Sequence, residues 1–300
     1  RPLRPERSAL AKLSYAPSVT TQVVYGNERT NQGAKSAIAG DRPHGRRVGR
    51  IWRVEGFLLA YAWLTIALCA ARFGRAWENM MSGLVEGKAV LVTGGSLGIG
   101  EAAARIFARE GARVALAGRG RERGEAVAAS IAADGGEAIY IQADVSHPEQ
   151  VEAMVARVVS EFGRLDCAFN NAGAGVPSGP LAEIDAAAWD AAIAGYLTSA
   201  FLCMKYELRH MAARGGGVIL NNASVDGLRG FPQDPAYSAA KHGVIGLTRS
   251  AALQYARQGI RINALCPGWI GTPHVVEAFR QRPDALAAAL LHQPIGRLGR

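Results

Sequence analysis

The sequence has few cysteines, no collagen-type glycine repeat, and almost no net charge over most of its length. Its four cysteines lie far apart in a chain of 300 residues and form no CxxC or Cys/His cluster, so neither a disulfide scaffold nor a structural zinc site is expected. The 36 glycines follow no Gly-X-Y period, which excludes a collagen. Hydrophobic residues make up 49% of the chain and charged residues 20%, which excludes a wholly disordered protein.

The net charge of +9 is concentrated in the first 79 residues. That segment carries 13 Lys and Arg against 5 Asp and Glu, whereas residues 80–300 are nearly neutral. Residues 1–55 mix Arg, Pro, Gly and Ser without a sustained apolar period, so we expect them to be mostly disordered. No aromatic residues interleave these arginines in a recognisable module, and we expect no nucleic-acid partner.

An apolar segment, residues 57–71, interrupts this extension. As a helix, its 15 residues would reach about 22 Å, which falls short of the roughly 30 Å hydrocarbon core of a bilayer. It also begins too far from the N-terminus for a typical secretory signal. We therefore interpret residues 1–79 as a disordered or leader extension of a cytoplasmic protein. A membrane-associating helix is the alternative.

From Gly87 onward, short apolar runs alternate with amphipathic helical stretches. This order is typical of βαβ units and a parallel sheet, and the continuous apolar character of several runs indicates helices on both sheet faces. The pattern predicts an α/β doubly wound fold whose ligand crevice lies at the carboxyl ends of the strands. The expected strands are residues 89–93, 113–117, 137–142, 166–170, 218–222 and 261–266.

The first of these strands runs into a glycine-rich turn, Thr93-Gly94-Gly95-Ser96-Leu97-Gly98-Ile99-Gly100, before a helix expected to begin near Glu101. Glycines allow a tight turn and a close backbone approach to a pyrophosphate, which the N–H groups and the dipole of the helix stabilise. Strand-to-helix turns also use glycine for structural reasons alone. The turn by itself therefore leaves both interpretations open.

Further motifs follow the later strands. Asn170-Asn171-Ala172-Gly173 ends the fourth strand, Ser224 follows the fifth, Tyr237-Ser-Ala-Ala-Lys241 begins thirteen residues after that serine, and Pro267-Gly268 follows the sixth. With these motifs at this joint spacing, residues 84–300 resemble the classical short-chain dehydrogenase/reductase family. The resemblance implies a Rossmann-type sheet and an NAD(P)-dependent oxidoreductase that interconverts a small-molecule secondary alcohol and a ketone.

Ser224, Tyr237 and Lys241 are the expected catalytic residues. Tyr237 and Lys241 are four apart and share one face of a helix, and an adjacent ammonium favours the phenolate form of a tyrosine. Tyr237 is therefore predicted to be the general acid for ketone reduction and the general base for alcohol oxidation. The resemblance implies that Ser224 hydrogen-bonds the substrate oxygen and that Lys241 also holds the nicotinamide ribose.

The segment after the second strand bears on cofactor choice. It reads Ala117-Gly118-Arg119, with no acidic residue to accept hydrogen bonds from the ribose of NAD, whereas Arg119 can pair with the 2'-phosphate of NADP. NADP is favoured over NAD, although the arginines here could also form a solvated helix start. The expected cofactor-binding residues are Gly94, Ser96, Gly98, Ile99, Gly100, Arg119, Asp144, Asn171, Gly173, Tyr237, Lys241, Pro267 and Thr272.

Several of these residues have a structural alternative. Asp144 resembles the family residue that contacts the adenine, but it could instead cap the helix that starts near Pro148. Thr272 resembles the threonine that bonds the nicotinamide carboxamide. Asn170 or Asn171 could serve only to tie strands together, and Trp269 could either contact substrate or pack against the core.

One position departs from the family pattern. Where the family has a helix asparagine that supports a proton-relaying water, this sequence has Tyr196, whose larger ring cannot occupy the same space. We expect slowed but surviving turnover. Val225, Asp226 and Trp269 are the expected substrate wall, and the substrate itself is not identified by the motifs. The histidines share no metal-ligand spacing, so no metal site is expected.

The family's final helix and strand have no counterpart after Leu290. We therefore expect a domain truncated at its C-terminus, with the last strand of the sheet missing and the sixth strand as an exposed edge. The complete chain would be a homodimer or homotetramer, assembled through the helices near residues 189–213 and 235–257. A catalytically weak nucleotide-binding or scaffold protein is the alternative function, prompted by Tyr196 and the missing terminus.

Overall fold

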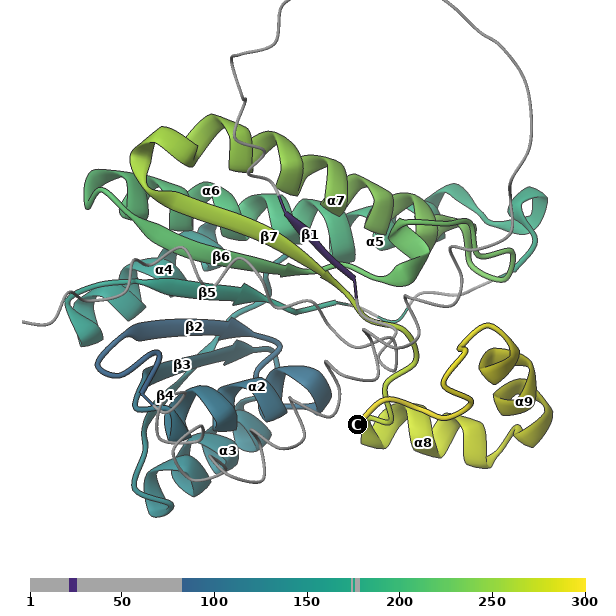
Figure 1. Cartoon of the computed structure of the whole chain (residues 1–300), viewed down its shortest axis with the longest axis horizontal. Coiled ribbons are helices and arrows are strands. Elements are labelled where there is room, and N and C mark those ends of the chain that lie inside the picture. The colour runs from purple at the N-terminus through teal and green to yellow at the C-terminus, as the bar shows by residue number, and fades with distance from the viewer. Residues whose placement is uncertain (1–21, 26–82, 174, 176–178) are drawn as a thin grey trace, which may run out of the picture. The chain divides into compact units, whose positions relative to one another are not determined.

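One twisted sheet organises the residues that the computed structural model describes, which are 22–25, 83–173, 175 and 179–300 (Figure 1). Its strand order is β1-β7-β6-β5-β2-β3-β4. All neighbouring strands from β2 to β7 are parallel. The strands are β1 (Gln22–Tyr25), β2 (Ala89–Thr93), β3 (Arg113–Gly118), β4 (Glu137–Gln142), β5 (Cys167–Asn170), β6 (Gly217–Asn222) and β7 (Ile260–Cys266).

The predicted doubly wound α/β class is confirmed. Each of the six predicted strands is present, and no boundary differs from its prediction by more than one residue. The sequence order of the strands reverses between β2 and β5, which pair from Val90 opposite Cys167 to Thr93 opposite Asn170. A ligand crevice is expected beyond the carboxyl ends of these two strands.

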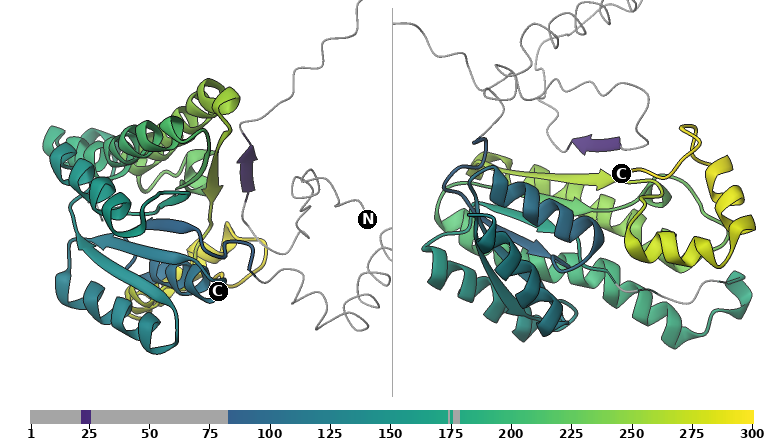
Figure 2. Two further views of the ribbon diagram at one scale, coloured as in Figure 1. Left: turned by 90° about the vertical axis from the view of Figure 1, so that its left-hand side faces the viewer. Right: turned by 90° about the horizontal axis from the view of Figure 1, so that it is seen from below.

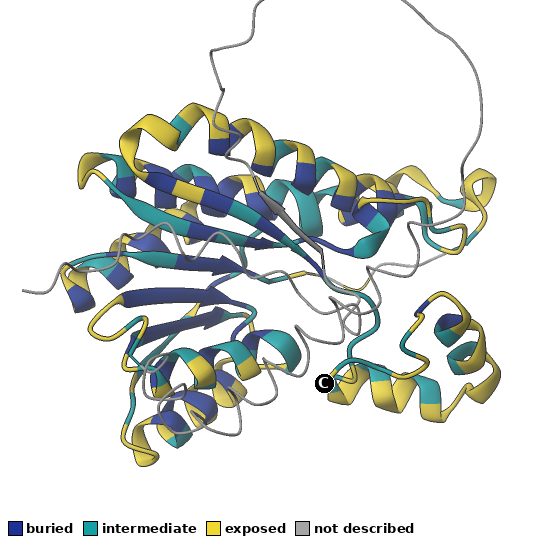
Figure 3. Cartoon of the chain, in the orientation of Figure 1, coloured by how far each residue is buried: buried dark blue, intermediate teal, exposed yellow. Residues whose placement is uncertain are grey.

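Helices cover both faces of the sheet (Figures 1 and 2). The side chains of α2 and α3 form one core cluster with β2 and β3, and those of α4, α6 and α7 form a second on the opposite face. Figure 3 shows the buried residues along these strands and on the inward sides of the helices. The helices are α2 (Gly98–Arg109), α3 (Arg121–Ala133), α4 (Pro148–Phe162), α5 (Ala186–Ala192), α6 (Ser199–Ala213), α7 (Pro235–Tyr255), α8 (Pro273–Arg280) and α9 (Pro283–Leu291).

Short helical turns complete the fold. A π-helical turn, η3 (Ile193–Thr198), joins α5 to α6, and three 3₁₀ turns are η2 (Leu181–Glu183), η4 (Val225–Gly227) and η5 (Ala256–Gln258). The helical run Ala186–Ala213 has 28 residues at a mean hydropathy of 1.2, so it could cross a membrane by length and composition. Its α6 portion packs against α4 and α7 and carries the fully buried Glu207, which accounts for its apolar face as part of the core.

The edge of the sheet corrects one expectation. The sixth predicted strand, β7, is not a free edge, because β1 pairs with it antiparallel from Gln22 opposite Cys266 to Tyr25 opposite Asn263 (Figure 2). The strand β1 lies within residues 1–55, of which the structure describes only Gln22–Tyr25, so the expectation that this segment is mostly disordered stays a prediction. Backbone pairing at an open edge satisfies N–H and C=O groups whatever the side chains are, so apolar periodicity did not reveal this strand. The apolar segment 57–71 lies outside the described residues.

Candidate active site

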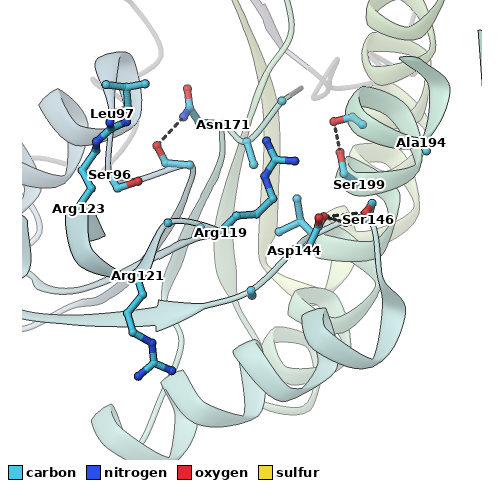
Figure 4. A pocket seen from close by; sticks show the side chains of 18 of the residues that line it. Ser96, Leu97, Arg119, Arg121, Arg123, Asp144, Ser146, Asn171, Ala194 and Ser199 are labelled. Atoms are coloured by element: carbon cyan, nitrogen blue, oxygen red, sulfur yellow. Dashed lines mark hydrogen bonds between the residues drawn. The ribbon is translucent and has the colours of Figure 1, made fainter. Parts of the chain in front are cut away.

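Two adjoining cavities lie along the carboxyl edge of the sheet. The first has a volume of about 900 Å³ and is bounded by the turn after β2 and by the segments that follow β3 and β4. We call it the arginine cavity, after Arg119, Arg121 and Arg123 in its wall (Figure 4). The second, of about 580 Å³, has Tyr237 in its wall and is called the tyrosine cavity. Asn171 and Gly173 line both cavities.

The glycine turn between β2 and α2 forms the floor where the cavities meet. Gly94 and Gly98 have φ values of 65° and 57°, a region that favours glycine. A Cβ on Gly100 would lie 2.1 Å from the carbonyl oxygen of Gly94, so a larger residue would force the turn apart. No side chain caps α2 at Leu97, which leaves N–H groups of its first turn for a ligand.

The turn lies against the start of α8. An ideal Cβ on Gly98 would be 3.1 Å from the Thr272 methyl carbon, and Thr272 lines the tyrosine cavity with Ile99 and Pro267. The Thr272 hydroxyl accepts a hydrogen bond from the Val275 N–H at 3.4 Å and so caps α8. Four predicted cofactor residues from distant parts of the chain are thus brought together, with Gly94 and Ser96 across the turn in the arginine cavity.

The arginine cavity is electropositive at the end of β3. Within the described residues, neither Arg119 nor Arg123 forms an ion pair within 4.0 Å or a side-chain hydrogen bond. Arg121, in contrast, donates to the Gln142 side chain at 3.2 Å and pairs with Glu125 at 3.8 Å. In Figure 4 the Arg119 side chain extends into the cavity, whereas Arg121 extends away from it. Arg119 is therefore free to bind an anion.

Asp144 lines the same cavity at the end of β4. Its Oδ1 accepts hydrogen bonds from the N–H and the hydroxyl of Ser146, at 3.0 and 2.7 Å. Burial works against the charged carboxylate, but the Ser146 hydrogen bonds and the nearby Arg119 hold the pKa of Asp144 below its ordinary value. The N-cap residue of α4 is His147, so Asp144 fixes a local turn and does not cap that helix.

Asn170 and Asn171 both tie the structure together. The Asn171 side chain donates to the carbonyl oxygen of Thr93 at 3.1 Å and accepts from the Asn222 amide at 2.9 Å. The buried Asn170 donates to Asn221 on β6 and to Glu207 on α6, at 3.1 and 3.0 Å. Asn171 therefore has the structural role, and because it also lines both cavities its contact with the cofactor stays a prediction.

A buried carboxyl lies behind the site. Glu207 is fully buried, and burial raises its pKa to about 7. Its second oxygen, Oε1, and the side-chain oxygen Oδ1 of Asn170 are both buried without a hydrogen-bond partner among the described residues. A protonated Glu207 supplies the donor that an ionised carboxylate lacks. Sequence analysis did not identify this residue, because a glutamate on an apolar helix gives no periodic signal.

The structure brings Ser224, Tyr237 and Lys241 together in the tyrosine cavity. Ser224 follows β6 and begins η4, and its Oγ accepts the Asp226 N–H at 3.1 Å. Tyr237 lies in the first turn of α7, where its N–H donates to the Asp234 carboxylate at 3.1 Å. The Asp-Pro pair at the start of α7 is a typical helix-start signal, so the sequence contained this anchor although it was not used.

Lys241 lies one turn further along α7 and is buried. Its Nζ donates to the carbonyl oxygen of Asn222 at 2.7 Å and lies 5.5 Å from the centroid of the Tyr237 ring. Burial lowers the pKa of Lys241 to about 8. This partner on β6 is a backbone atom, which no residue pattern could indicate.

The expected lowering of the Tyr237 pKa is not produced by the protein's own groups. The pKa of Tyr237 is raised to about 12, chiefly by burial and also by the charges of Asp226 and Asp234, against the lowering effect of the hydrogen bond with the Ser224 hydroxyl. The Lys241 Nζ donates to the Asn222 carbonyl oxygen, and within the described residues no hydrogen bond joins it to the Tyr237 hydroxyl. The phenol consequently keeps its proton at neutral pH, which is the state a general acid requires.

Tyr196 occupies the space between these groups. It lies on η3, and its ring meets the Tyr237 ring edge-on, with centroids 4.9 Å apart and an interplanar angle of 83°. The Lys241 Nζ lies 4.9 Å from the centroid of the Tyr196 ring. An ideal Cβ on Gly173 would be 2.6 Å from the Tyr196 ring, so only glycine admits the tyrosine here. Burial raises the pKa of Tyr196.

An aromatic wall closes the far side of the tyrosine cavity. The Trp269 ring lies 6.4 Å from that of Phe231 and 5.1 Å from that of Phe279, both edge-on. Trp269 lines the cavity and packs against these two rings, and its contact with a substrate stays a prediction. Phe231 and Phe279 were not identified in advance, because isolated aromatic residues in loops and short helices carry no spacing signal.

The described residues hold no group of three or more His, Cys, Asp or Glu side chains that could bind a metal ion. Cys167, Cys203 and Cys266 are free thiols at strand or helix positions, and burial raises the pKa of each.

Comparison with known proteins matches residues 88–283 to the profile of the short chain dehydrogenase family. The chain is 43% identical over 213 residues to cis-4-hydroxycyclohexanecarboxylate dehydrogenase from Sinomonas cyclohexanicum, which covers 71% of this chain and 84% of that protein. It is 44% identical over 216 residues to 2,5-dichloro-2,5-cyclohexadiene-1,4-diol dehydrogenase from Sphingobium indicum, with the same coverage.

Solved structures agree with this result. Levodione reductase superposes with a TM-score of 0.68 at 39% identity, covering 71% of this chain and 86% of that one. A variant of the actinorhodin polyketide ketoreductase with NADPH superposes with a TM-score of 0.67 at 35% identity, covering 71% and 85%.

Proposed function

The chain belongs to the classical short-chain dehydrogenase/reductase family and is an NAD(P)-dependent oxidoreductase, and from this premise we propose that it interconverts a cyclic ketone and the corresponding secondary alcohol. In this proposal Tyr237 is the general acid for the reduction and the general base for the oxidation. The observation that carries the proposal is the convergence of Ser224, Tyr237 and Lys241 in a cavity that adjoins the glycine turn.

The residues present fit a nicotinamide dinucleotide. The uncapped start of α2 and the close backbone approach at Gly94 and Gly100 suit a pyrophosphate, and the unpaired Arg119 suits a further anion. Asn171, Gly173, Pro267 and Thr272 would line the remainder of the site. When bound, the cofactor supplies the hydride.

The protein's own residues supply orientation and a proton. The Ser224 hydroxyl would donate a hydrogen bond to the ketone oxygen, and the Tyr237 phenol would transfer its proton to that oxygen as the carbon is reduced. Lys241 would stabilise the phenolate that remains, since an ammonium favours the charged form of a nearby phenol. The raised pKa of Tyr237 keeps the phenol protonated for the reductive direction.

Cyclic substrates are favoured by two observations. The dehydrogenases and the reductase at about 40% identity are named for a hydroxycyclohexanecarboxylate, a cyclohexadienediol and levodione. The tyrosine cavity, about 580 Å³ with Phe231 and Trp269 in its wall, offers flat apolar surface to a ring. Incubation of the purified protein with cyclohexanone and NADPH should oxidise the cofactor. No oxidation with any ketone of a cyclic series would contradict the proposal.

We further propose NADP as the preferred cofactor, on the strength of Arg119. Steady-state rates with NADPH and NADH at equal concentration should favour NADPH by about tenfold, the value of one charge-assisted hydrogen bond. Arg119→Ala should abolish that preference. Arg257→Ala, an exposed arginine just before β7 at the opposite edge of the sheet, should keep it. A parent protein that prefers NADH would refute the assignment.

A catalytically weak nucleotide-binding protein is the second candidate, and the packing of Tyr196 against Lys241 and Tyr237 favours it. Tryptophan fluorescence would detect NADPH binding independently of turnover. Binding without oxidation by any carbonyl compound would support this candidate over the enzyme.

Assembly as a homodimer or homotetramer is also proposed. Phe201 on α6 is 46% exposed and Leu253 on α7 is 67% exposed, so both helices present large apolar side chains for a second copy. Light scattering on the full chain would measure the mass, and a monomer at high concentration would contradict the proposal. Cytoplasmic localisation stays a prediction from the sequence.

A further inference from the structure

One carboxylate in the tyrosine cavity has no role in the chemistry described so far. Asp226 lies in η4, two residues after Ser224, and lines the cavity with Phe231 and Trp269. Its backbone N–H binds the Ser224 hydroxyl, but that contact would exist with any side chain at this position. The side chain therefore needs a separate explanation.

Among the residues that the structure describes, the Asp226 side chain has no strong stabilising interaction. Within the described residues Asp226 forms no ion pair within 4.0 Å, and its only side-chain hydrogen bond is a long one from the Ser224 hydroxyl to Oδ2, at 3.5 Å. The charge of Arg229 acts on Asp226, yet its guanidinium donates to the carbonyl oxygen of His292, at 3.5 Å. A partly buried carboxylate without an ion pair is costly unless a ligand compensates it.

The backbone that carries Asp226 is held in place by the fold. The η4 turn is closed by the hydrogen bond from the Gly227 N–H to the Ser224 carbonyl oxygen, at 3.0 Å, and the Val225 N–H binds the Pro267 carbonyl oxygen at 3.0 Å. A Cβ on Gly227 would lie 2.7 Å from the Lys241 carbonyl oxygen, so the turn is packed directly onto α7. Asp226 is therefore fixed relative to the catalytic residues, as a specificity-determining group must be.

Its position limits which substrate atom it can reach. Ser224 would bind the oxygen of the reacting carbon, and Asp226 Oδ2 lies 3.5 Å from the Ser224 oxygen. Two protein oxygens at this spacing match two substrate oxygens on adjacent carbons more closely than two oxygens on opposite sides of a ring, so a hydroxyl on the neighbouring carbon fits best between Ser224 and Asp226. A carboxylate accepts such a bond well, because charge-assisted hydrogen bonds are the strong ones.

We propose that Asp226 selects substrates with a hydroxyl on the carbon next to the reacting carbon: α-hydroxyketones in the reductive direction and vicinal diols in the oxidative direction. This inference rests on the proposed function of the site. The reaction is unchanged, since the carbonyl carbon gains a hydride from reduced NADP and its oxygen gains the Tyr237 proton, which yields the diol. The neighbouring hydroxyl donates a hydrogen bond to the carboxylate and is not deprotonated.

Two isomeric ketones test the proposal. In 2-hydroxycyclohexanone the hydroxyl is next to the carbonyl, and in 4-hydroxycyclohexanone it is across the ring, so the isomers share composition and charge. The quantity to measure is the ratio of kcat/KM for the 2-hydroxy isomer to kcat/KM for the 4-hydroxy isomer, with NADPH as the cofactor. In the parent protein this ratio should exceed the ratio set by the intrinsic reactivity of the two ketones by at least about tenfold. The ratio in Asp226→Ala provides that intrinsic reference and should be about tenfold lower.

Two further variants sharpen the result. Asp226→Asn keeps an acceptor oxygen without the charge, so its ratio should fall between those of the parent and Asp226→Ala, and it serves in place of the alanine variant if that one does not fold. Asp134→Asn makes the same change at the exposed C-terminus of α3 and should keep the parent ratio. Equal ratios in the parent and both Asp226 variants, with both ketones reduced, would overturn this inference and leave the proposed function standing. Failure to reduce either isomer or cyclohexanone would overturn both.

Discussion

The arginine cavity and the tyrosine cavity share the glycine turn, yet they are built differently. The arginine cavity depends on backbone geometry, with residue types fixed by steric limits such as the 2.1 Å approach at Gly100. The tyrosine cavity depends on side chains whose partners compete: Lys241 binds Asn222, Ser224 approaches Asp226, and Tyr196 packs against both Tyr237 and Lys241. Steric requirements leave a clear mark in a sequence, whereas competition among side chains does not.

A substitution at Gly100 tests the steric account of the glycine turn and should have the largest effect. Gly100→Ala should lower the free energy of unfolding by more than about 4 kcal/mol and weaken NADPH binding, because the new methyl meets backbone atoms that cannot rotate away. Gly120→Ala is the matched control, since Gly120 lines the arginine cavity and an ideal Cβ there meets no described atom within 4 Å. Chemical denaturation and fluorescence titration would measure both effects. Equal stability of the two variants would contradict the steric account.

The buried Glu207, behind the site, tests the second part of the comparison, in which side chains depend on their partners. Because its folded-state pKa, about 7, exceeds the ordinary value of 4.5, the folded protein holds this proton more tightly than the unfolded chain does. Glu207 therefore makes its full contribution to the free energy of unfolding below the ordinary pKa of 4.5. That contribution, roughly 3 kcal/mol, is lost as the pH rises to about 7.

Glu207→Gln should remove this loss, since glutamine mimics the neutral acid and donates to Asn170. Denaturation at pH 5 and pH 8 should show the parent less stable at the higher pH and the variant less affected. Glu152→Gln, an exposed glutamate on α4, should behave as the parent does. If the difference in free energy of unfolding between the parent and Glu207→Gln is the same at pH 5 and pH 8, Glu207 is ionised in the folded protein and the account of this residue is wrong.

The smallest expected effect concerns Tyr196. Tyr196→Asn removes the ring that packs on Lys241, so the proton relay should improve and kcat should rise by about threefold to tenfold. Tyr196→Phe keeps the ring and loses only the hydroxyl, and its kcat should stay near the parent value. An asparagine variant no faster than the parent would count against an impaired relay.

These differences explain how far the sequence could be interpreted. The β2 to β7 strands and the glycine turn follow from apolar runs and glycine spacing, and they were predicted to within a residue. Ser224, Tyr237 and Lys241 were predicted from their joint spacing, and they meet in one cavity. The backbone partner of Lys241, the neutral-acid environment of Glu207 and the pairing of β1 with β7 depend on tertiary contacts, and no local pattern encodes them.

The central claim is that the Tyr237 phenol supplies the proton for carbonyl reduction, and Tyr237→Phe tests it most directly. Turnover of a cyclic ketone that the parent protein reduces should fall by at least about 100-fold, while fluorescence titration still shows NADPH binding. Turnover that persists undiminished in this variant would contradict the account.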